Sequence, residues 1–521
     1  MKKWMKSTAA LALTASLVAG CSTPSSSTAP TAQPNDKGGS APQAAAGAAD
    51  KFKDKLSLNL MSITYEGGGW PDKHPMIDYL NKKFNVDLKF TWVPSDSYTE
   101  KLGVIAASNT FPDAFFIDMN NFLKWRDKGA FLDVKPLLAN YPNLTKDIKP
   151  ETFALGNPSG KVYGVPVYTP ETRDTLVIRK DWLDKLGLKY PTNTDELYNV
   201  AKAFAKNDPD GNGKDDTIGF STSISGGTSF ANLDFLKFAF GLANGWKDVN
   251  GALVPWQTQN KELKDFLGYL RKAYAEGVLD KDFAVNKNND PSVKAEANKL
   301  GIHQLVATAI YAEGSSGSEQ NIKKTAPNAQ WTTGAPPKGP SGAQGVGTAA
   351  SANKVVINAK IDKNKQERIL AILDYLATDE GDILNKNGVE GIHYKKTADN
   401  KYEKLDAFDK DRPFIIGFWF FRKVNPLTTY RLWDDAAYAK RIYAIFDENA
   451  KYANPNKGVG VFSDTAAKSG TSLDQKLMSE MVKYIVGEIK EDGIDKAIDD
   501  WKKNGGNKII DEMNAAYKLM K

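Results

Sequence analysis

The chain has 521 residues, of which 41% are hydrophobic and 25% charged, the composition of a globular protein large enough for more than one domain. The formal net charge is +6, but three lysines lie in residues 1–20, which hold no acidic residue, so the rest carries about +3. Because the basic residues are scattered and no nucleic-acid-binding motif is present, these numbers argue against a nucleic-acid partner.

The first 21 residues have the pattern of a secretory signal. Three lysines precede an apolar run over residues 9–18, and small residues then lead to Cys21, the only cysteine. The run is shorter than the about 20 residues of a membrane-spanning helix. Leu17-Val18-Ala19-Gly20-Cys21 resembles the bacterial lipobox, whose cysteine is acylated and becomes the new N-terminus. We therefore expect a lipoprotein signal peptide at residues 1–20 and a lipid anchor on Cys21, at the extracellular face of the cell membrane. The alternative is an ordinary signal peptide with an incidental cysteine.

Residues 21–50 consist mostly of Ser, Thr, Pro, Ala, Gln and Gly. Such a segment buries too little apolar surface to offset the entropy lost on ordering. We expect it to be a disordered tether between the anchor and the folded body.

The folded body begins with an alternation of strand and helix patterns. Apolar residues alternate with polar ones over 56–60 and 86–90, and 114–117 is a short apolar run, so strands are predicted at all three places. Helical patterns lie between them, at 77–84 and 97–107. Strand, helix, strand, helix, strand is the order of an open α/β sheet.

Later segments repeat these patterns. Extended segments are predicted at 162–167 and 175–178, and apolar residues at helical spacing predict helices around 197–204, 263–274, 369–376 and 473–485. Asn193 followed by Glu196 predicts the start of one of these helices by a capping box. Residues 334–345 are rich in Gly, Pro and Ser and mark a loop or crossover. We interpret the chain as two α/β lobes, each discontinuous in sequence.

A calcium-like loop spans residues 208–216. Oxygen-bearing side chains fall at its positions one, three, five and nine, with glycine at position six. Calcium takes six to eight oxygens at about 2.3–2.6 Å, and this spacing curls the oxygens around one point. The predicted ligands are Asp208, Asp210, Asn212, Asp216 and the backbone carbonyl of Lys214.

The loop departs from an EF-hand at position twelve, which is Gly219 instead of glutamate. A further ligand would have to come from Thr217, from water or from elsewhere. The alternative is a metal-free turn of Asp and Asn residues that closes the preceding helix. If calcium binds, we expect its role to be structural.

Motifs for catalysis are scarce. The three histidines, His74, His303 and His393, are far apart in the sequence, and H-E-x-x-H, a Walker loop and G-x-S-x-G are all missing. We expect these histidines to be surface or packing residues. A formal G-x-G-x-x-A at 345–350 follows a loop instead of a strand and does not indicate a dinucleotide site. Carboxylates are plentiful, so counting residues does not exclude a glycosidase pair.

Several aromatic residues stand in predicted loops instead of on apolar stripes. Flat apolar rings suit the C–H faces of sugars, and charged side chains suit sugar hydroxyls. In open α/β sheets, ligands bind beyond the carboxyl ends of the strands. Each ring could equally be packing. The candidates for stacking on a ligand are Trp70, Tyr168, Trp246, Tyr311 and Trp419, and those for hydrogen bonding are Tyr65, Glu66, Asp118 and Arg173.

Besides the loop at 208–216, four segments are informative together: 111–116 (FPDAFF), 160–166 (GKVYGVP), 178–187 (IRKDWLDKLG) and 269–277 (YLRKAYAEG). With these segments in this order, the chain resembles, over nearly all of its mature length, the family 1 extracellular solute-binding lipoproteins of carbohydrate ABC importers. Within this family it is similar to the LplA-like and alginate-binding-like group. The resemblance implies a periplasmic-binding-protein-like α/β fold of class II, with two lobes, each an open sheet flanked by helices, joined by a hinge. We assign 51–169 and 346–395 to the N-lobe, and 170–345 and 396–521 to the C-lobe.

The resemblance also implies a function. An oligosaccharide would be held between the lobes and delivered to the transmembrane permease, with no catalysis and with calcium in the 208–216 loop. The alginate binders carry an acid where this chain has Thr217. We expect a monomer. Two other hypotheses remain open: a surface-anchored lyase or hydrolase acting on carbohydrate, and a binding lipoprotein for a nutrient that is not a sugar.

Overall fold

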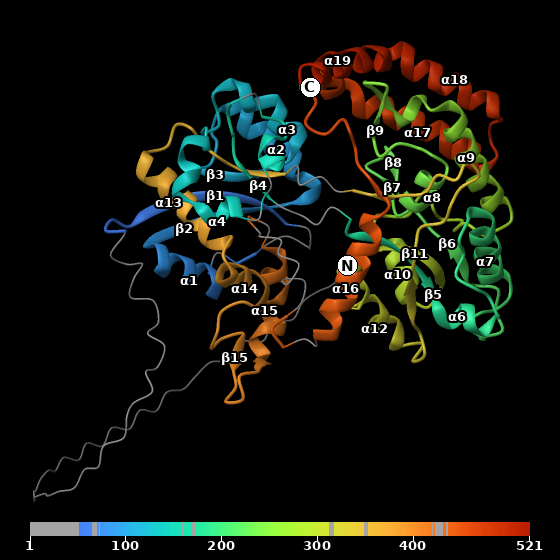
Figure 1. Ribbon diagram of the computed structural model, residues 1–521, viewed down its shortest axis with the longest axis horizontal. Helices are drawn as coiled ribbons and strands as arrows, with labels where there is room; N and C mark the ends of the chain where they lie inside the picture. Colours follow the sequence, from blue (N-terminus) through green and yellow to red (C-terminus); the bar gives the residue numbers. More distant parts are fainter. Residues whose placement is uncertain are drawn as a thin grey trace, which may run out of the picture. The chain divides into compact units, whose positions relative to one another are not determined.

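Figure 1 shows the computed structural model of the protein. It describes residues 52–64, 70–71, 73–146, 148, 150–157, 160–167, 172–311, 317–348, 353–418, 420–421, 431–433 and 436–520. The predicted signal peptide at 1–20, Cys21 and the tether at 21–50 lie outside these residues. Within them, every helix is too short or too polar to span a bilayer.

The first lobe is built on a five-stranded sheet with the order β2-β1-β3-β14-β4. Strand β1 runs parallel to β2 and β3, whereas β14 runs antiparallel to β3 and β4. Helices α1 and α2 connect the first three strands, which confirms the predicted strand–helix alternation. The bounds are β1 (Leu56–Thr64), α1 (Pro75–Phe84), β2 (Val86–Pro94), α2 (Ser95–Ser108), β3 (Ala114–Ile117), β4 (Val165–Pro166) and β14 (Lys354–Ile357).

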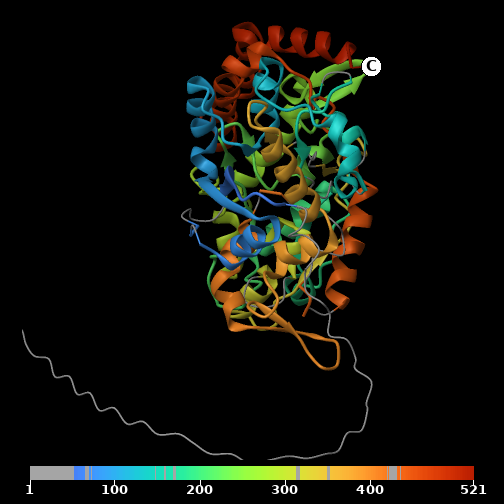
Figure 2. The same ribbon diagram turned by 90° about the vertical axis from the view of Figure 1, so that its left-hand side faces the viewer.

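Further helices complete this lobe. They are α3 (Met119–Trp125), α4 (Pro142–Lys146), α5 (Pro150–Ala154), α13 (Lys363–Leu376), α14 (Asp379–Asn387) and α15 (Asp406–Gly417). A hairpin of β15 (Tyr394–Lys396) and β16 (Tyr402–Lys404) projects from the body (Figure 2, orange). The core gathers alternate residues of the strands, such as Leu58 and Leu60 of β1, with the apolar faces of the helices.

The second lobe is built on a four-stranded sheet with the order β12-β5-β11-β6. Its strands are β5 (Asp174–Arg179), β6 (Ile218–Phe220), β11 (Leu300–Val306) and β12 (Trp331–Thr333). Both faces of β5 are buried: Leu176 and Ile178 belong to one apolar core and Val177 to another. This explains why the strand reads as a continuous apolar run instead of an alternating one.

Helices cover both faces of this sheet. They are α6 (Lys180–Lys185), α7 (Thr194–Lys206), α8 (Asp234–Ala239), α9 (Asn260–Ala275), α10 (Asp290–Glu296), α11 (Ala307–Ile310), α12 (Ser318–Lys323), α16 (Ala436–Ala450), α17 (Thr471–Val486), α18 (Glu491–Trp501) and α19 (Asn507–Lys518). The smaller strands are β7 (Ile224–Ser225), β8 (Ser229–Phe230), β9 (Trp246–Val249), β10 (Ala252–Pro255), β13 (Val346–Gly347) and β17 (Ala453–Asn454). Helix α17 packs on α9 in this lobe (Figure 1, red on green).

Helix α7 shows how local sequence sets an element. The Asn193 side chain accepts a hydrogen bond from the Glu196 N–H at 2.9 Å, as an N-cap does. The Glu196 carboxylate reaches back to the N–H of Thr192 at 2.8 Å, one residue before the predicted partner. The predicted apolar stripe is buried, because Leu197, Val200, Ala201 and Phe204 face the core.

The structure differs from the predicted assignment of residues 396–521 to the second lobe. Phe408, Phe414 and Ile415 of α15 pack into the first core, together with Phe418 and Phe420. The second lobe is joined at α16, whose Ile442 belongs to a core there. Periodicity tells which face of a helix is apolar, but it does not tell which of two sheets that face will cover.

Candidate functional site

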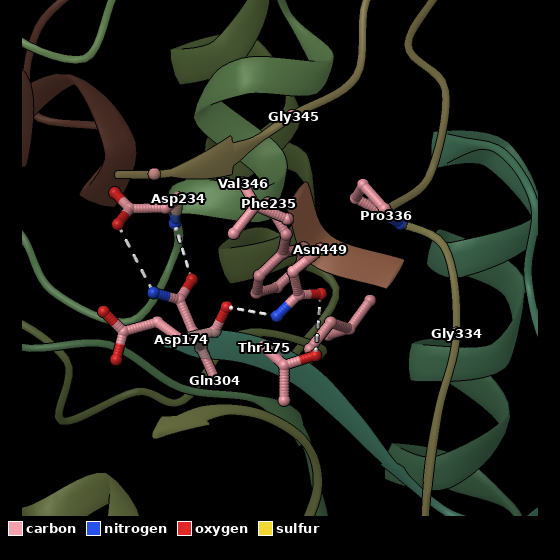
Figure 3. A pocket seen from close by; sticks show the side chains of 12 residues that line it. Asp174, Thr175, Asp234, Phe235, Gln304, Gly334, Pro336, Gly345, Val346 and Asn449 are labelled. Atoms are coloured by element: carbon pink, nitrogen blue, oxygen red, sulfur yellow. Dashed lines mark hydrogen bonds between the residues drawn. The ribbon is translucent and has the colours of Figure 1, made fainter. Parts of the chain in front are cut away.

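A small pocket, lined by both polar and apolar residues, lies in the second lobe at the start of β5. Its walls come from segments that are far apart in the sequence: the ends of β5 and β11, the first turn of α8, the strand β13 and the end of α16 (Figure 3). The lining residues are Asp174, Thr175, Leu176, Asp234, Phe235, Gln304, Gly334, Pro336, Gly345, Val346, Gly347 and Asn449.

Hydrogen bonds fix the polar side chains of this pocket. The side-chain oxygen of Gln304 accepts a hydrogen bond from the Asp234 N–H at 3.0 Å, and its Nε2 donates one to Asp234 Oδ2 at 3.3 Å. The Asn449 amide donates to the backbone carbonyls of Thr172 and Asp174, each at 3.1 Å. Figure 3 shows the bonds that join Asp234 to Gln304 and Asn449 to β5. The positions of these polar side chains are therefore set by hydrogen bonds between several helices and strands, not by one loop.

The two carboxyls of the pocket have pKa values shifted in opposite directions. Burial raises the pKa of Asp174, against the opposing effect of Arg173, and the charge of Asp234 raises it further. Burial also acts to raise the pKa of Asp234, but the Lys237 ammonium and the hydrogen bonds of Lys237 and Gln304 outweigh it and leave that pKa low. Arg173 Nε lies 3.3 Å from Asp174 Oδ2, and Lys237 Nζ lies 2.8 Å from Asp234 Oδ1.

This arrangement offers paired acceptors and donors at a partly exposed surface. The side chains of Asp174 and Asp234 are 27% and 31% exposed, so both can still meet a ligand. Gly347 of β13 passes close by, because a Cβ there would lie 3.1 Å from Asp234 Oδ2. Carboxylates flanked by a guanidinium, an ammonium and amides suit polar, hydroxyl-bearing ligands.

Four of the predicted ligand residues, Tyr65, Glu66, Tyr168 and Trp419, lie outside the described residues. Of the five others, Arg173 stands beside the pocket through its contact with Asp174. Asp118 caps α3, since its two oxygens accept from the N–H and the side-chain amide of Asn121.

The three described aromatic candidates lie apart from the pocket lining. The Trp70 ring packs edge-on to Phe414, with ring centroids 5.7 Å apart. Trp246 in β9 packs against the second lobe's core. The Tyr311 hydroxyl donates to the Trp331 carbonyl at 3.4 Å, and the Arg441 guanidinium lies 4.7 Å from its ring centroid. Each of the three rings thus has packing or hydrogen-bond partners inside the protein. That they also stack on a ligand stays a prediction.

The loop at 208–216 is tightly folded. The carboxylate of Asp208 accepts from the backbone N–H groups of Gly211, Asn212 and Gly213, each at 3.0 Å. Burial and a hydrogen bond with Asp208 raise the pKa of the Asp210 carboxyl. The amide nitrogen of Asn212 donates to Asp210 at 2.8 Å and to Asp216 at 3.1 Å. The carboxylates of positions three and nine thus meet at the side-chain amide of position five, and the carboxylate of position one accepts from its backbone N–H.

The donor set fits a calcium ion. The carboxylate oxygens that now accept from the Asn212 side-chain N–H₂ group could instead bind a cation at that position. The Asn212 amide would then rotate so that its oxygen, and not its nitrogen, faces the cation. Thr217 is a poor further ligand, because its hydroxyl is buried and donates to the Phe204 carbonyl at 2.7 Å. The remaining ligands would then be water or groups outside the loop.

Two of the three histidines meet in the fold, which the sequence did not indicate. His74, at the start of α1, and His393 direct their Nε2 atoms to Asp411 Oδ2, at 3.8 and 3.2 Å. All three ligand-capable atoms lie within 4.8 Å of one another, the spacing of a metal site. All three histidines are buried, so the expected packing role is confirmed and a surface role is wrong.

The tautomers of these histidines oppose metal binding. The Met76 N–H donates to His74 Nδ1 at 3.2 Å, and the Val389 N–H donates to His393 Nδ1 at 2.7 Å. A ring nitrogen that accepts a hydrogen bond carries no proton, so each neutral ring holds its proton on Nε2, the atom a metal would need. Burial also lowers the pKa of His74 to about 4. The cluster therefore brings His74, at the start of α1, and His393 beside Asp411 of α15.

Sequence reasoning missed Asp174, Asp234, Gln304 and Asn449. They come from β5, α8, β11 and α16, and no motif joins them. The one available signal was the acid next to Arg173 at the start of a predicted strand. Their proximity arises from sheet pairing, because β11 lies against β5 with Gln304 opposite Leu176.

The fold and pocket define the class of the molecule: a two-lobe binding protein of the α/β type. The chain belongs to the family of bacterial extracellular solute-binding proteins, whose model matches residues 71–383. Lipoprotein LipO of Bacillus subtilis (strain 168) is 31% identical over 535 residues, which cover 100% of this chain and 99% of that protein. The polygalacturonan/rhamnogalacturonan-binding protein YtcQ of the same organism is 29% identical over 90% of this chain and 92% of that protein.

Solved structures share the fold. The HMO-binding, ABC-transporter-associated solute-binding protein of Bifidobacterium longum infantis aligns with a TM-score of 0.71 at 17% identity, over 89% of this chain and 99% of that one. The Streptococcus pneumoniae ABC-transporter substrate-binding protein FusA in complex with kestose aligns at 0.69 and 22%, with the same coverage. The alginate-binding protein AlgQ2 without calcium ion aligns at 0.66 and 19%, over 89% of this chain and 98% of that one. The predicted two-lobe α/β class is therefore confirmed.

Proposed function

We propose that this protein captures an oligosaccharide outside the cell and delivers it to the permease of an ABC importer. The observation that carries the proposal is the pocket at β5, with its hydrogen-bonded polar side chains, in a member of a solute-binding family. The names of two proteins similar to this one support the ligand class, since YtcQ is a polygalacturonan/rhamnogalacturonan-binding protein and FusA was solved with kestose.

The pocket chemistry suits saccharide hydroxyls. A carboxylate oxygen accepts from one hydroxyl while a neighbouring guanidinium, ammonium or amide donates to the next, so adjacent hydroxyls of one sugar can be met together. In this proposal Asp174, Asp234 and Gln304 join the residues predicted from sequence. The proposed stacking residues remain Trp70, Tyr168, Trp246, Tyr311 and Trp419, and the proposed hydrogen-bonding residues remain Tyr65, Glu66, Asp118 and Arg173.

Binding would be coupled to a change in the relation of the two lobes. A ligand shifts a conformational equilibrium only by its difference in affinity for the two states. A saccharide that touches both lobes in the closed state alone would therefore favour closure, and the closed form would dock on the permease. No bond of the ligand is broken in this scheme.

Calorimetry against a panel of oligosaccharides tests the proposal. We expect one class of saccharide to bind, and Asp174→Ala and Asp234→Ala to weaken that binding at least tenfold by removing acceptors. Asp265→Ala is the matched control, because Asp265 pairs with Lys261 on the surface of α9. X-ray scattering with the same saccharide should show a smaller radius of gyration. Absence of heat with every saccharide would contradict the proposal.

The same mixtures distinguish the other hypotheses. A surface lyase or hydrolase would shorten the saccharide, which chromatography of the recovered ligand would detect. A receptor for another nutrient would bind none of the panel. We expect the ligand to be recovered intact.

We also propose that the 208–216 loop binds one calcium ion with a structural role. Its support is that Asp210 and Asp216 both accept from the side-chain amide of Asn212, while Asp208 accepts from the backbone N–H of the same residue. A FusA structure described as an EF-hand mutant and the AlgQ2 structure described as lacking calcium are consistent with such a loop in proteins of similar fold. The ion would be held by Asp208, Asp210, Asn212, Asp216 and the Lys214 carbonyl, with water completing the shell.

We propose, finally, that Cys21 carries the lipid anchor and that residues 1–20 are removed as a signal peptide. The similarity to Lipoprotein LipO over the whole chain supports this. The protein would then act as a monomer tethered at the extracellular face of the membrane.

A further inference from the structure

Two lysines of this chain reach the loop at 208–216. Lys299 Nζ lies 3.7 Å from Asp216 Oδ2. Lys185 Nζ donates to the backbone carbonyl of Asp208 at 3.1 Å. Of the two, Lys299 is the one whose charge faces a predicted ligand carboxylate.

The fold places Lys299 there whether or not a metal is bound. The loop leads directly into β6, and β6 pairs in parallel with β11, with Ile218 opposite Leu300. The Ile218 N–H donates to the Lys299 carbonyl at 2.7 Å. The backbone of Lys299 is thus held by Ile218, which follows Asp216 by two residues. Only the Lys299 side chain would have to move when a cation binds.

The same strand prevents the loop from supplying the ligand of position twelve. Gly219 holds that position inside β6, where a Cβ would lie 2.6 Å from the Ala201 carbonyl oxygen and 2.8 Å from that of Val278. No larger side chain fits there. The loop itself therefore supplies no side-chain ligand at position twelve.

We propose that Lys299 is a built-in competitor of the calcium ion. This inference rests on the proposed calcium site. In the metal-free protein the Lys299 ammonium would offset part of the negative charge of the loop, chiefly that of Asp216. A calcium ion would be repelled by this ammonium, so the Lys299 side chain would have to move away when the ion binds. Lys299 would therefore lower the affinity for calcium and, at the same time, stabilise the loop when no metal is bound.

The size of the effect follows from Coulomb's law. A single charge close to a divalent ion at a water-exposed site, with salt screening, changes affinity by about threefold to tenfold. Lys299 is suited to this comparison because its side chain is 50% exposed, so its removal leaves no cavity.

The test is isothermal titration of calcium chloride into chelator-treated protein. We expect Lys299→Gln to bind calcium about threefold to tenfold more tightly than the unmodified chain. Lys299→Glu should bind more tightly still, since it adds a carboxylate beside the ion. The matched control is Lys261→Gln, which removes an exposed lysine paired with Asp265 on α9 of the same lobe and should leave calcium affinity unchanged.

A second measurement examines the metal-free protein. Without calcium, Lys299→Gln should melt at a lower temperature than the unmodified chain, and saturating calcium should remove this difference. Equal calcium affinity in the unmodified chain and in Lys299→Gln would overturn the role of Lys299 while leaving the calcium site intact. Failure of all variants to bind calcium would overturn the calcium site itself and the inference with it.

Discussion

His303 and His74 are neutral groups buried where a charge would be costly. His303 in β11 has its Nε2 3.1 Å from Ser292 Oγ, and its Nδ1 has no hydrogen-bond partner in the described part of the chain. Burial lowers the pKa of His303 to about 4, and burial likewise lowers that of His74 to about 4. Both values lie well below 6.5, the ordinary value.

These shifts make stability depend on pH. In the unfolded chain each histidine takes up a proton near pH 6.5, whereas in the folded protein it does so near 4. Their contribution is therefore fully present above pH 6.5 and is lost as the pH falls from 6.5 toward 4. We expect the free energy of unfolding to fall by up to about 1.4 kcal/mol per pH unit for each group in this range.

Urea denaturation between pH 8 and 5 measures this slope. The matched variant is His303→Gln, which replaces the imidazole with an amide that does not titrate. Its slope between pH 6.5 and 5 should be shallower than that of the unmodified chain, whatever its stability at pH 8. Identical slopes would show that His303 takes up no extra proton on unfolding.

At the scale of elements, strand β6 can pack against its neighbours only with a glycine at position 219. The missing side chain of Gly219 admits the carbonyl oxygen of Ala201 from α7, so helix and strand approach more closely than any other residue would allow. We expect Gly219→Ala to lower the free energy of unfolding by about 1–3 kcal/mol, because backbone atoms must shift to make room.

Gly268 in α9 is the matched comparison. A Cβ there would meet no atom within 4 Å. Gly268→Ala should therefore raise the free energy of unfolding by about 0.5–1 kcal/mol, since glycine loses more backbone entropy in a helix than alanine does. Thermal melts of the two variants measure the difference, and the same sign in both would refute the packing argument for Gly219.

At the scale of the whole molecule, the anchor decides where the protein acts. If Cys21 is acylated, the full-length chain expressed in a bacterium that processes lipoproteins should remain with the membrane fraction. Cys21→Ala should release the protein, because the thiol that would carry the lipid is then missing. Fractionation and labelling with a radioactive fatty acid measure this, and membrane retention of the unlabelled variant would argue against a lipid anchor on Cys21.

Local sequence determined the elements and their class. The cap at Asn193, the buried stripe of α7, the alternation of β1 and the apolar run at β3 were all predicted correctly, because each depends on neighbours within a few residues. The family was also recognisable, because its segments follow one another along the chain in a fixed order.

Tertiary structure alone decided which distant residues meet. Asp234 and Gln304 are joined only because α8 begins beside β11, and His74 and His393 meet at Asp411 only because α15 packs in the first lobe instead of the second. Apolar periodicity states that a face will be buried, but it leaves the partner open. The partner is chosen by sheet pairing and by the filling of a particular core, which are properties of the whole fold.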